Sequence, residues 1–122
     1  MYFTNRIMDK IRVFKAEFFK VLASPIRIAI LDSLRNDEVS VSEICNIVAQ
    51  EQSVISQHLA ILRNRNLVKY RKQGNIVYYS VTDKDIFKLL DDALLISKKQ
   101  VFGIQNMIND SLNLNTIIWL IK

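Results

Sequence analysis

A change of hydrophobic period in the middle of the chain most constrains what this sequence can fold into. Before Asn66 and after Thr82, apolar residues recur every three or four positions, the spacing of amphipathic helices. Between them, residues 67–81 hold two runs rich in β-branched and aromatic residues around a turn at Gly74, which predicts a β-hairpin. Two Gly and one Pro among 122 residues exclude disordered, collagen-like and turn-rich all-β classes. The predicted fold is therefore mainly α with a small β-hairpin.

The N-terminal third carries the signals of two helices. Apolar residues at helical spacing, with charged residues between them, predict a first helix over about residues 5–22. Ser24 then has the character of an N-cap and Pro25 that of a first helical residue, where the missing N–H costs nothing. A second helix is expected to run from Pro25 to about Arg35.

Residues 40–64 have the pattern of a helix-turn-helix. Ser40 and Glu43 form a capping box, which predicts a short third helix to about Ala49. A further apolar stripe from Val54 to Leu62 begins only a few residues later. Two short helices joined by a tight turn fit helix-turn-helix geometry.

The order of the expected elements is that of a winged helix-turn-helix. The hairpin at residues 67–81 follows the second helix of the pair and would be the wing, and Thr82 is expected to head a long last helix. We expect one domain over residues 1–122.

Charge is distributed unevenly along the chain, whose net charge is +5. Residues 52–82 contain no Asp or Glu, and a polyanion such as DNA would suit this segment because each cation near a phosphate releases condensed counterions. A solvated basic face explains the charge equally well. The basic residues are Arg63, Arg65, Lys69, Arg71 and Lys72.

Three motifs in this order resemble the ArsR/SmtB family of bacterial and archaeal transcriptional repressors. Residues 19–31 resemble the opening signature of the family, residues 52–63 with 66–68 its recognition helix, and residues 71–80 its wing. The resemblance covers about residues 14–97. It implies a homodimer that binds a partly palindromic operator in double-stranded DNA and leaves it when an inducer binds.

The first turns of the expected recognition helix carry the polar side chains Gln52, Ser53, Ser56 and Gln57. Amide and hydroxyl groups in the major groove hydrogen-bond base edges or phosphates, and Gln57 could pair with the N6/N7 edge of adenine. The alternative is a polar face that is merely solvated.

Phosphate and minor-groove contacts are expected at the tip of the wing. Arg63 would reach a phosphate as well, whereas Arg65 could equally form surface ion pairs. The sequence departs from the family in the turn before the recognition helix, where Ala49 and Glu51 replace the usual Gly and Ser/Thr. The expected wing contacts are Arg71, Lys72, Gln73 and Asn75.

Neither a metal trigger nor a disulfide trigger is expected, and no cofactor. The chain has one cysteine, Cys45, and Ile47 stands where a family Cys-x-Cys site has its second thiol. We expect Cys45 to be a small buried apolar residue. The single histidine, His58, is expected to pack or hydrogen-bond beside the recognition helix rather than to bind a ligand. The second metal site of the family falls on Asp83, Asp85, Ile96 and Lys99, of which the last two cannot complete it.

Residues 1–22 and 83–122 are expected to pair across a two-fold axis, because their apolar faces are too large for the winged-helix core alone. The tail at residues 112–122 is expected to cover these helices; a partner or membrane-surface contact is the alternative. The longest apolar run has five residues against the roughly 20 that a membrane span needs, so we expect no membrane among its partners. The single cysteine is compatible with a reducing cytoplasm, where we expect the protein to be.

The expected function is a sequence-specific DNA-binding repressor, controlled by an unknown small molecule, by a partner protein or by its own abundance. The alternative is a winged-helix module for protein interaction without specific DNA binding. An enzyme ranks last, because the chain lacks a nucleophile–base set, a phosphate-binding Gly loop and a metal cluster.

Overall fold

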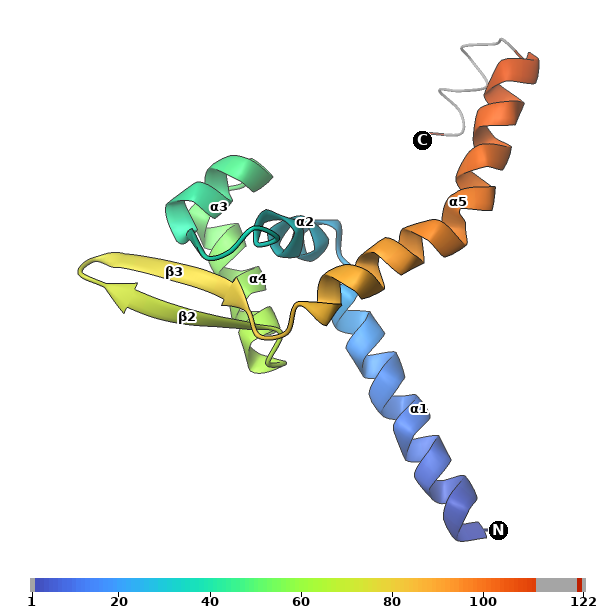
Figure 1. The fold of residues 1–122 in the computed structure, drawn as a ribbon, viewed down its shortest axis with the longest axis horizontal. Coiled ribbons are helices and arrows are strands. Elements are labelled where there is room, and N and C mark those ends of the chain that lie inside the picture. The colour runs from blue at the N-terminus through green and yellow to red at the C-terminus, as the bar shows by residue number, and fades with distance from the viewer. Residues whose placement is uncertain (1, 112–120, 122) are drawn as a thin grey trace. The chain divides into compact units, whose positions relative to one another are not determined.

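The computed structural model describes residues 2–111 and 121, and within them a mostly helical chain with one small sheet (Figure 1). The sheet has three antiparallel strands in the order β1-β3-β2. The fold is thus a winged helix-turn-helix, as predicted. In chain order the elements are α1 (Tyr2–Leu22), α2 (Pro25–Ser33), β1 (Val39–Ser40), α3 (Val41–Val48), α4 (Gln52–Asn64), β2 (Val68–Gln73), β3 (Ile76–Val81) and α5 (Asp85–Ser111).

The starts of α2 and α3, predicted from Ser24 and Ser40 as caps, are confirmed. Ser24 Oγ accepts a hydrogen bond from the backbone N–H of Arg27 at 3.2 Å, and Pro25 is the first residue of α2. Ser40 Oγ accepts from the backbone N–H of Glu43, also at 3.2 Å. These bonds satisfy donors that the first helical turn leaves without a partner in the helix.

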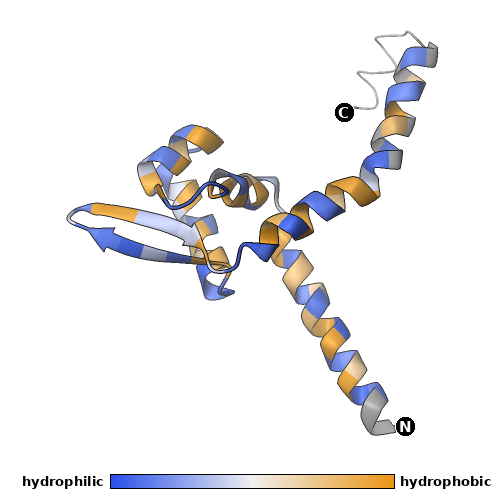
Figure 2. Ribbon diagram, in the orientation of Figure 1, coloured by the Kyte–Doolittle hydropathy of each residue, from blue (hydrophilic) through white to orange (hydrophobic). Residues whose placement is uncertain are grey.

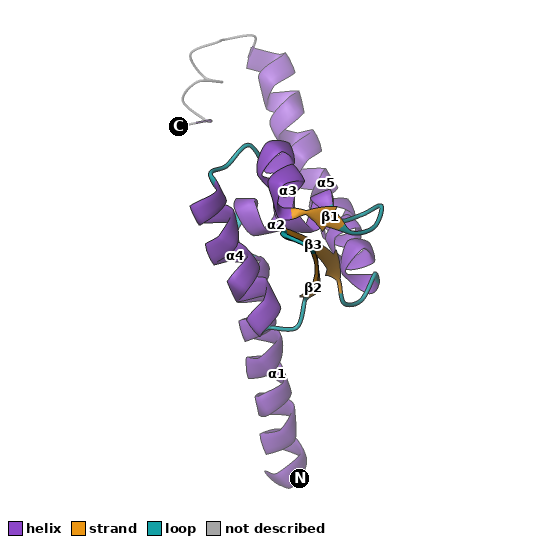
Figure 3. Ribbon diagram, turned by 90° about the vertical axis from the view of Figure 1, so that its left-hand side faces the viewer, coloured by secondary structure: helices purple, strands orange, loops and turns teal. Residues whose placement is uncertain are grey.

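Strand β1 is the one element of the winged-helix part that the sequence pattern did not predict. It pairs with β3 through Val39 opposite Tyr79 and Ser40 opposite Tyr78 (Figure 3). Ser40 is therefore both the end of a strand and the N-cap of α3, which fixes the helix-turn-helix to the central strand of the wing.

A buried apolar core joins α2, α3 and α4 to the base of the sheet. Burial of each large aliphatic side chain contributes about 1.5–3 kcal/mol, which is why these helices keep one relative arrangement. The most deeply buried members, each 2% exposed or less, are Ile30, Leu31, Leu34, Ile44, Ile55, Leu59, Leu62 and Val68.

Turns at Gly74, Asn66 and Ala49 have left-handed backbone. Gly74 in the hairpin turn has φ +61°, which costs glycine nothing. Asn66 has φ +58°, a conformation that asparagine tolerates. Ala49, which ends α3 in the helix-turn-helix, has φ +60° and ψ +48°, where its Cβ is strained. The turn before α4 thus has a glycine-type geometry at an alanine.

The long C-terminal helix begins three residues later than predicted. Thr82 does not head it; its hydroxyl donates to the backbone carbonyl of Asn66 instead. Asp83 Oδ1 accepts from the N–H of Asp85 at 2.9 Å, and the helix starts there and continues through Gly103 to Ser111. A short side chain that bonds across to another segment is no longer free to cap its own helix.

The chain divides into two compact units, residues 1–87 and 88–122. No helix among the described residues is long and apolar enough to cross a membrane. The predicted covering role of residues 112–122 lies outside the described residues, apart from Ile121. The prediction of one domain over the whole chain remains a prediction.

Helix α1 is buried at its C-terminal end, half-buried at Glu17 and Phe18, and exposed over residues 5–16. Val21 and Leu22 are buried, whereas apolar side chains farther toward the N-terminus are exposed. Figure 2 shows hydrophobic and hydrophilic residues alternating along this helix. Phe14, with 72% of its surface accessible, is the most exposed of them. The other exposed members on α1 are Ile7, Met8, Ile11, Val13 and Phe19.

Candidate nucleic-acid interface

Helix α4 divides sharply into a buried apolar face and an exposed polar face. Ile55, Leu59 and Leu62 pack into the core with 1% exposure or less. The polar side chains predicted to contact DNA are exposed on the rest of the helix, so α4 is held by one face and offers the other to solvent. These side chains are Gln52, Ser53, Ser56, Gln57 and Arg63.

A cleft of about 530 Å³ separates this helix from the wing. Its walls come from α3, α4 and β3, and four predicted residues share it: Gln52, Ser56, Arg63 and Asn75. Ser53 and Gln57 lie on the same helix outside the lining. Arg71, Lys72 and Gln73 lie outside it on β2. The structure thus brings part of the predicted set together around one concave surface.

Sequence reasoning missed Ser42 and Asn46 of α3, which are exposed and line the same cleft. Their spacing of four residues places both on one face of α3. That spacing was a usable signal, but nothing in the sequence indicated that this face of α3 turns toward the recognition helix.

Arg63, near the end of α4, lies against the wing. Its guanidinium carbon is 5.2 Å from the ring centroid of Tyr70 on β2, a cation–π arrangement. Tyr70 is paired in register with Tyr79, and their ring centroids are 5.8 Å apart. The aromatic pair therefore supports Arg63 beside the cleft. Arg65 forms a surface ion pair with Glu17 at 3.8 Å, one of the two roles considered for it.

Arg71 is bound within the chain. Its Nε donates to the two carboxylate oxygens of Glu38 at 3.0 and 2.7 Å, and Nη1 donates to Gln73 Oε1 at 2.7 Å. Nη2 also donates to Glu38 Oε1. The hydrogen bonds between Arg71 and Glu38 lower the pKa of the Glu38 carboxyl below its ordinary value and raise the pKa of Arg71.

Helix α4 begins at Gln52, the first residue of the segment that resembles the family's recognition helix. Glu51 occupies the N-cap with extended backbone, and its side chain makes no capping hydrogen bond. A carboxylate at this position interacts favourably with the positive end of the helix dipole. The same carboxylate disfavours a phosphate at this helix start.

His58 hydrogen-bonds on the inner side of the recognition helix, as predicted. Its Nδ1 lies 3.1 Å from Nη1 of Arg27, whose Nε also donates to the backbone carbonyl of Val21. Since an arginine can only donate, the imidazole accepts and is neutral. Partial burial, and next the positive charge of Arg27, lower the pKa of His58.

Cys45 is half-buried and lines the cleft, so the prediction of a buried apolar residue is wrong. Cys45 is not fully buried because this side of α3 lines the cleft, where the neighbouring Asn46 is also exposed. Among the described residues, no group of three or more His, Cys, Asp or Glu side chains could hold a metal ion.

The proteins to which this chain is similar in sequence are transcription regulators. The model of the bacterial regulatory protein arsR family matches residues 24–70. The chain is 39% identical over 74 residues to the transcriptional repressor SmtB homolog of Synechocystis, covering 61% of this chain and 56% of that protein. It is 34% identical over 91 residues to the HTH-type transcriptional regulator NmtR of Mycobacterium tuberculosis, covering 75% of this chain and 76% of that one.

The crystal structure of NolR from Sinorhizobium fredii is similar in fold, with a TM-score of 0.67 and 36% identity. This similarity covers 73% of the chain and 89% of NolR. The matched region therefore includes nearly all of one solved relative, but little more than half the length of the SmtB homolog.

Proposed function

The chain belongs to the ArsR/SmtB family of DNA-binding transcription regulators and is not an enzyme, and from this premise we propose that it is a homodimeric repressor of a partly palindromic operator. The observation that carries the proposal is the division of α4 into a buried face and an exposed polar face beside the wing. An α-helix held in this way is suited to the major groove. Its place of action would be the cytoplasm, where the DNA is.

Base readout is assigned to Gln57, with Gln52, Ser53 and Ser56 as further contacts of the same exposed face. The amide of glutamine matches the donor and acceptor pair on the major-groove edge of adenine. Arg63, Lys72 and Asn75 are assigned to the sugar-phosphate backbone, where contacts position the protein without specifying sequence. Gln73 accepts a hydrogen bond from Arg71 and is not assigned to DNA.

Dimerisation is assigned to the flanking helices. Phe14 and its apolar neighbours on α1 remain exposed, as do Leu94, Leu95, Ile96 and Phe102 on α5. Apolar faces of this kind are typically covered by a second copy related by a two-fold axis. In such a dimer the two α4 helices would enter successive major grooves about 34 Å apart.

Release from DNA is assigned to a small molecule or protein rather than to a metal or disulfide. The full chain holds one cysteine and one histidine, and that histidine is the partner of Arg27. A single thiol does not hold a soft metal by itself and forms no disulfide within a chain.

Site selection from a randomised duplex pool tests the proposal, with anisotropy titrations of the selected duplex and a scrambled duplex over a salt series. We expect a selected site with two related halves, saturation at one dimer per site, and a steep dependence on salt. Equal affinity for the selected and scrambled duplexes would favour the alternative, a winged-helix protein-interaction module.

Gln57→Ala sharpens the same experiment. The variant should lose its preference at one base pair of each half-site, at a cost of about 1–3 kcal/mol for that position. Gln105→Ala, the same substitution at an exposed position of α5, is the matched control and should select the wild-type site. If Gln57→Ala selects the wild-type sequence at every position, the assignment of base readout fails.

A further inference from the structure

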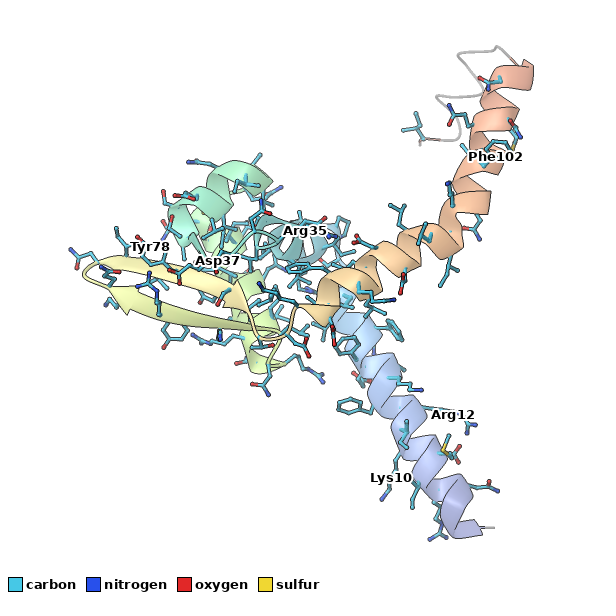
Figure 4. All side chains as sticks on the ribbon, viewed as in Figure 1. Lys10, Arg12, Arg35, Asp37, Tyr78 and Phe102 are labelled. Carbon is cyan, nitrogen blue, oxygen red and sulfur yellow. The ribbon has the colours of Figure 1, made fainter. Side chains whose placement is uncertain are left out.

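The side chain of Arg71 extends from β2 over β3 to Glu38. It lies on β2 and pairs in register with Tyr78 of the central strand β3. Its guanidinium carbon is 4.5 Å from the ring centroid of Tyr78, and beyond that ring it meets Glu38, the residue before β1. Tyr78 and Asp37 are labelled in Figure 4 and lie beside β3. Asp37 is the neighbour of Glu38 in the chain. One side chain thus links β2 and β3 to the residue that precedes β1.

The two wing cations predicted to contact DNA face opposite sides of the sheet. Side chains alternate along a strand, so Lys72 shares a face with Tyr70, and Arg71 lies on the other face with Tyr78. The Tyr70 face is the one that contacts α4, through Arg63. Lys72 is therefore on the side of the recognition helix, whereas Arg71 is on the far side.

The ion pair also cancels charge. Arg71 and Glu38 are both partly exposed, with 49% and 31% of their side-chain surface accessible, and the pair has no net charge to offer a polyanion. A phosphate could reach the Nε/Nη2 edge of the guanidinium only by displacing the carboxylate that already accepts from both nitrogens.

We propose that Arg71 is a positioning residue, which uses Glu38 as its anchor to hold the wing at a fixed angle, and that Lys72 supplies the phosphate contact. The proposal rests on the proposed function as a DNA-binding regulator, and it replaces the direct contact that the sequence predicts for Arg71. Strand β1 pairs with β3 through only two residues, so the Arg71–Glu38 pair adds a side-chain link where the backbone ladder is short.

The two roles of Arg71 predict opposite signs for Glu38→Gln. If Arg71 positions the wing, weakening its anchor lowers affinity for the selected operator about threefold, the range of a partly exposed ion pair. If Arg71 contacts a phosphate, the substitution frees it and removes an anion, so affinity rises. Glu43→Gln removes an exposed carboxylate five residues away and is the matched control, with affinity unchanged or slightly raised.

A charge exchange tests the same assignment by rescue. Arg71→Glu alone should weaken binding, and the double variant Glu38→Arg/Arg71→Glu should regain most of the loss, because the pair re-forms with its signs reversed. A glutamate cannot replace a phosphate-binding arginine. A double variant that binds as weakly as Arg71→Glu would overturn the proposal.

Salt dependence separates the two cations. Lys72→Ala should lower the slope of log Kd against log salt concentration by about 0.9, the value for one lost phosphate contact. Arg71→Lys should weaken binding with the slope unchanged. An unchanged slope for Lys72→Ala together with a lower slope for Arg71→Lys would assign the phosphate contact to Arg71 and overturn the proposal.

Hydrogen exchange of the free protein keeps this test independent of DNA binding. In Glu38→Gln the amides of β3 should exchange faster than in wild type, and those of α2 should not change. Unchanged exchange in β3 would contradict the positioning role. Failure of the wild-type protein to bind any selected duplex would instead overturn the proposed function alone.

Discussion

Helices α1 and α4 are both amphipathic by sequence, and yet the structure treats their apolar faces differently. The apolar face of α4 is buried against α2, α3 and the sheet, with Ile55, Leu59 and Leu62 at 1% exposure or less. On α1, only the last turn is buried, and Phe14 stands 72% exposed. Helical spacing of apolar residues therefore predicts that a face will be covered, but it does not say whether the same chain covers it.

Truncation of a side chain on the buried face of α4 should have the largest effect, a loss of folding stability. Leu62→Ala leaves a cavity in the core and should lower the free energy of unfolding by about 2–5 kcal/mol. Urea denaturation followed by circular dichroism measures it. A loss below about 1 kcal/mol would mean that the buried face of α4 is not what holds the recognition helix.

Truncation in the α1 face should act on association instead. Phe14→Ser should raise the dimer dissociation constant at least tenfold, because burial of a phenylalanine is worth about 1.5–3 kcal/mol per subunit. Sedimentation equilibrium measures it, with Lys15→Ser as the matched neighbour that should leave the constant unchanged. Equal dissociation constants for Phe14→Ser and wild type would remove α1 from the proposed dimer interface.

Glycine should have opposite effects in the two regions. Ala49→Gly relieves the left-handed strain of the helix-turn-helix turn and should raise the free energy of unfolding by about 1 kcal/mol. Ala16→Gly, the same substitution on the exposed side of α1, should lower it by about 1 kcal/mol, as in any helix interior. Thermal melts at one fixed protein concentration compare the two. The idea of a strained turn fails if Ala49→Gly melts below wild type.

Protonation of His58 at acidic pH should lower the stability of the fold. This is the smallest of the four effects predicted in this comparison. The folded state lowers the pKa of His58 below its ordinary value of 6.5, so below about that pH the unfolded chain binds more protons. The free energy of unfolding should therefore fall as the pH falls below 6.5.

The matched variant for this effect is His58→Asn, which keeps an acceptor for Arg27 at the position of Nδ1 but does not titrate. Denaturation series from pH 7.5 to pH 5 should show a shallower decline in stability for the variant than for wild type. Parallel declines would show that His58 is not the titrating group.

Most of the backbone could be predicted from local signals. The caps at Ser24 and Ser40, the apolar stripe of α4 and the turn at Gly74 each lie within a few residues of the element that they define. The exposed polar face of α4 follows from the same periodicity, because apolar residues claim the other face. For this reason the predicted fold and the predicted position of α4 agree with the structure.

The partners of the site residues depended on tertiary structure. Arg71 and Glu38 are 33 residues apart, Arg27 and His58 are 31 apart, and Arg63 meets Tyr70 across a turn. Strand β1 has only two residues, too few to show a period, and exists because β3 lies beside it. A residue's type determines which bonds it can make, whereas the packed core determines which partner is within reach. The sequence alone therefore identified Arg71 as a wing cation, and only the fold showed that its charge is already paired.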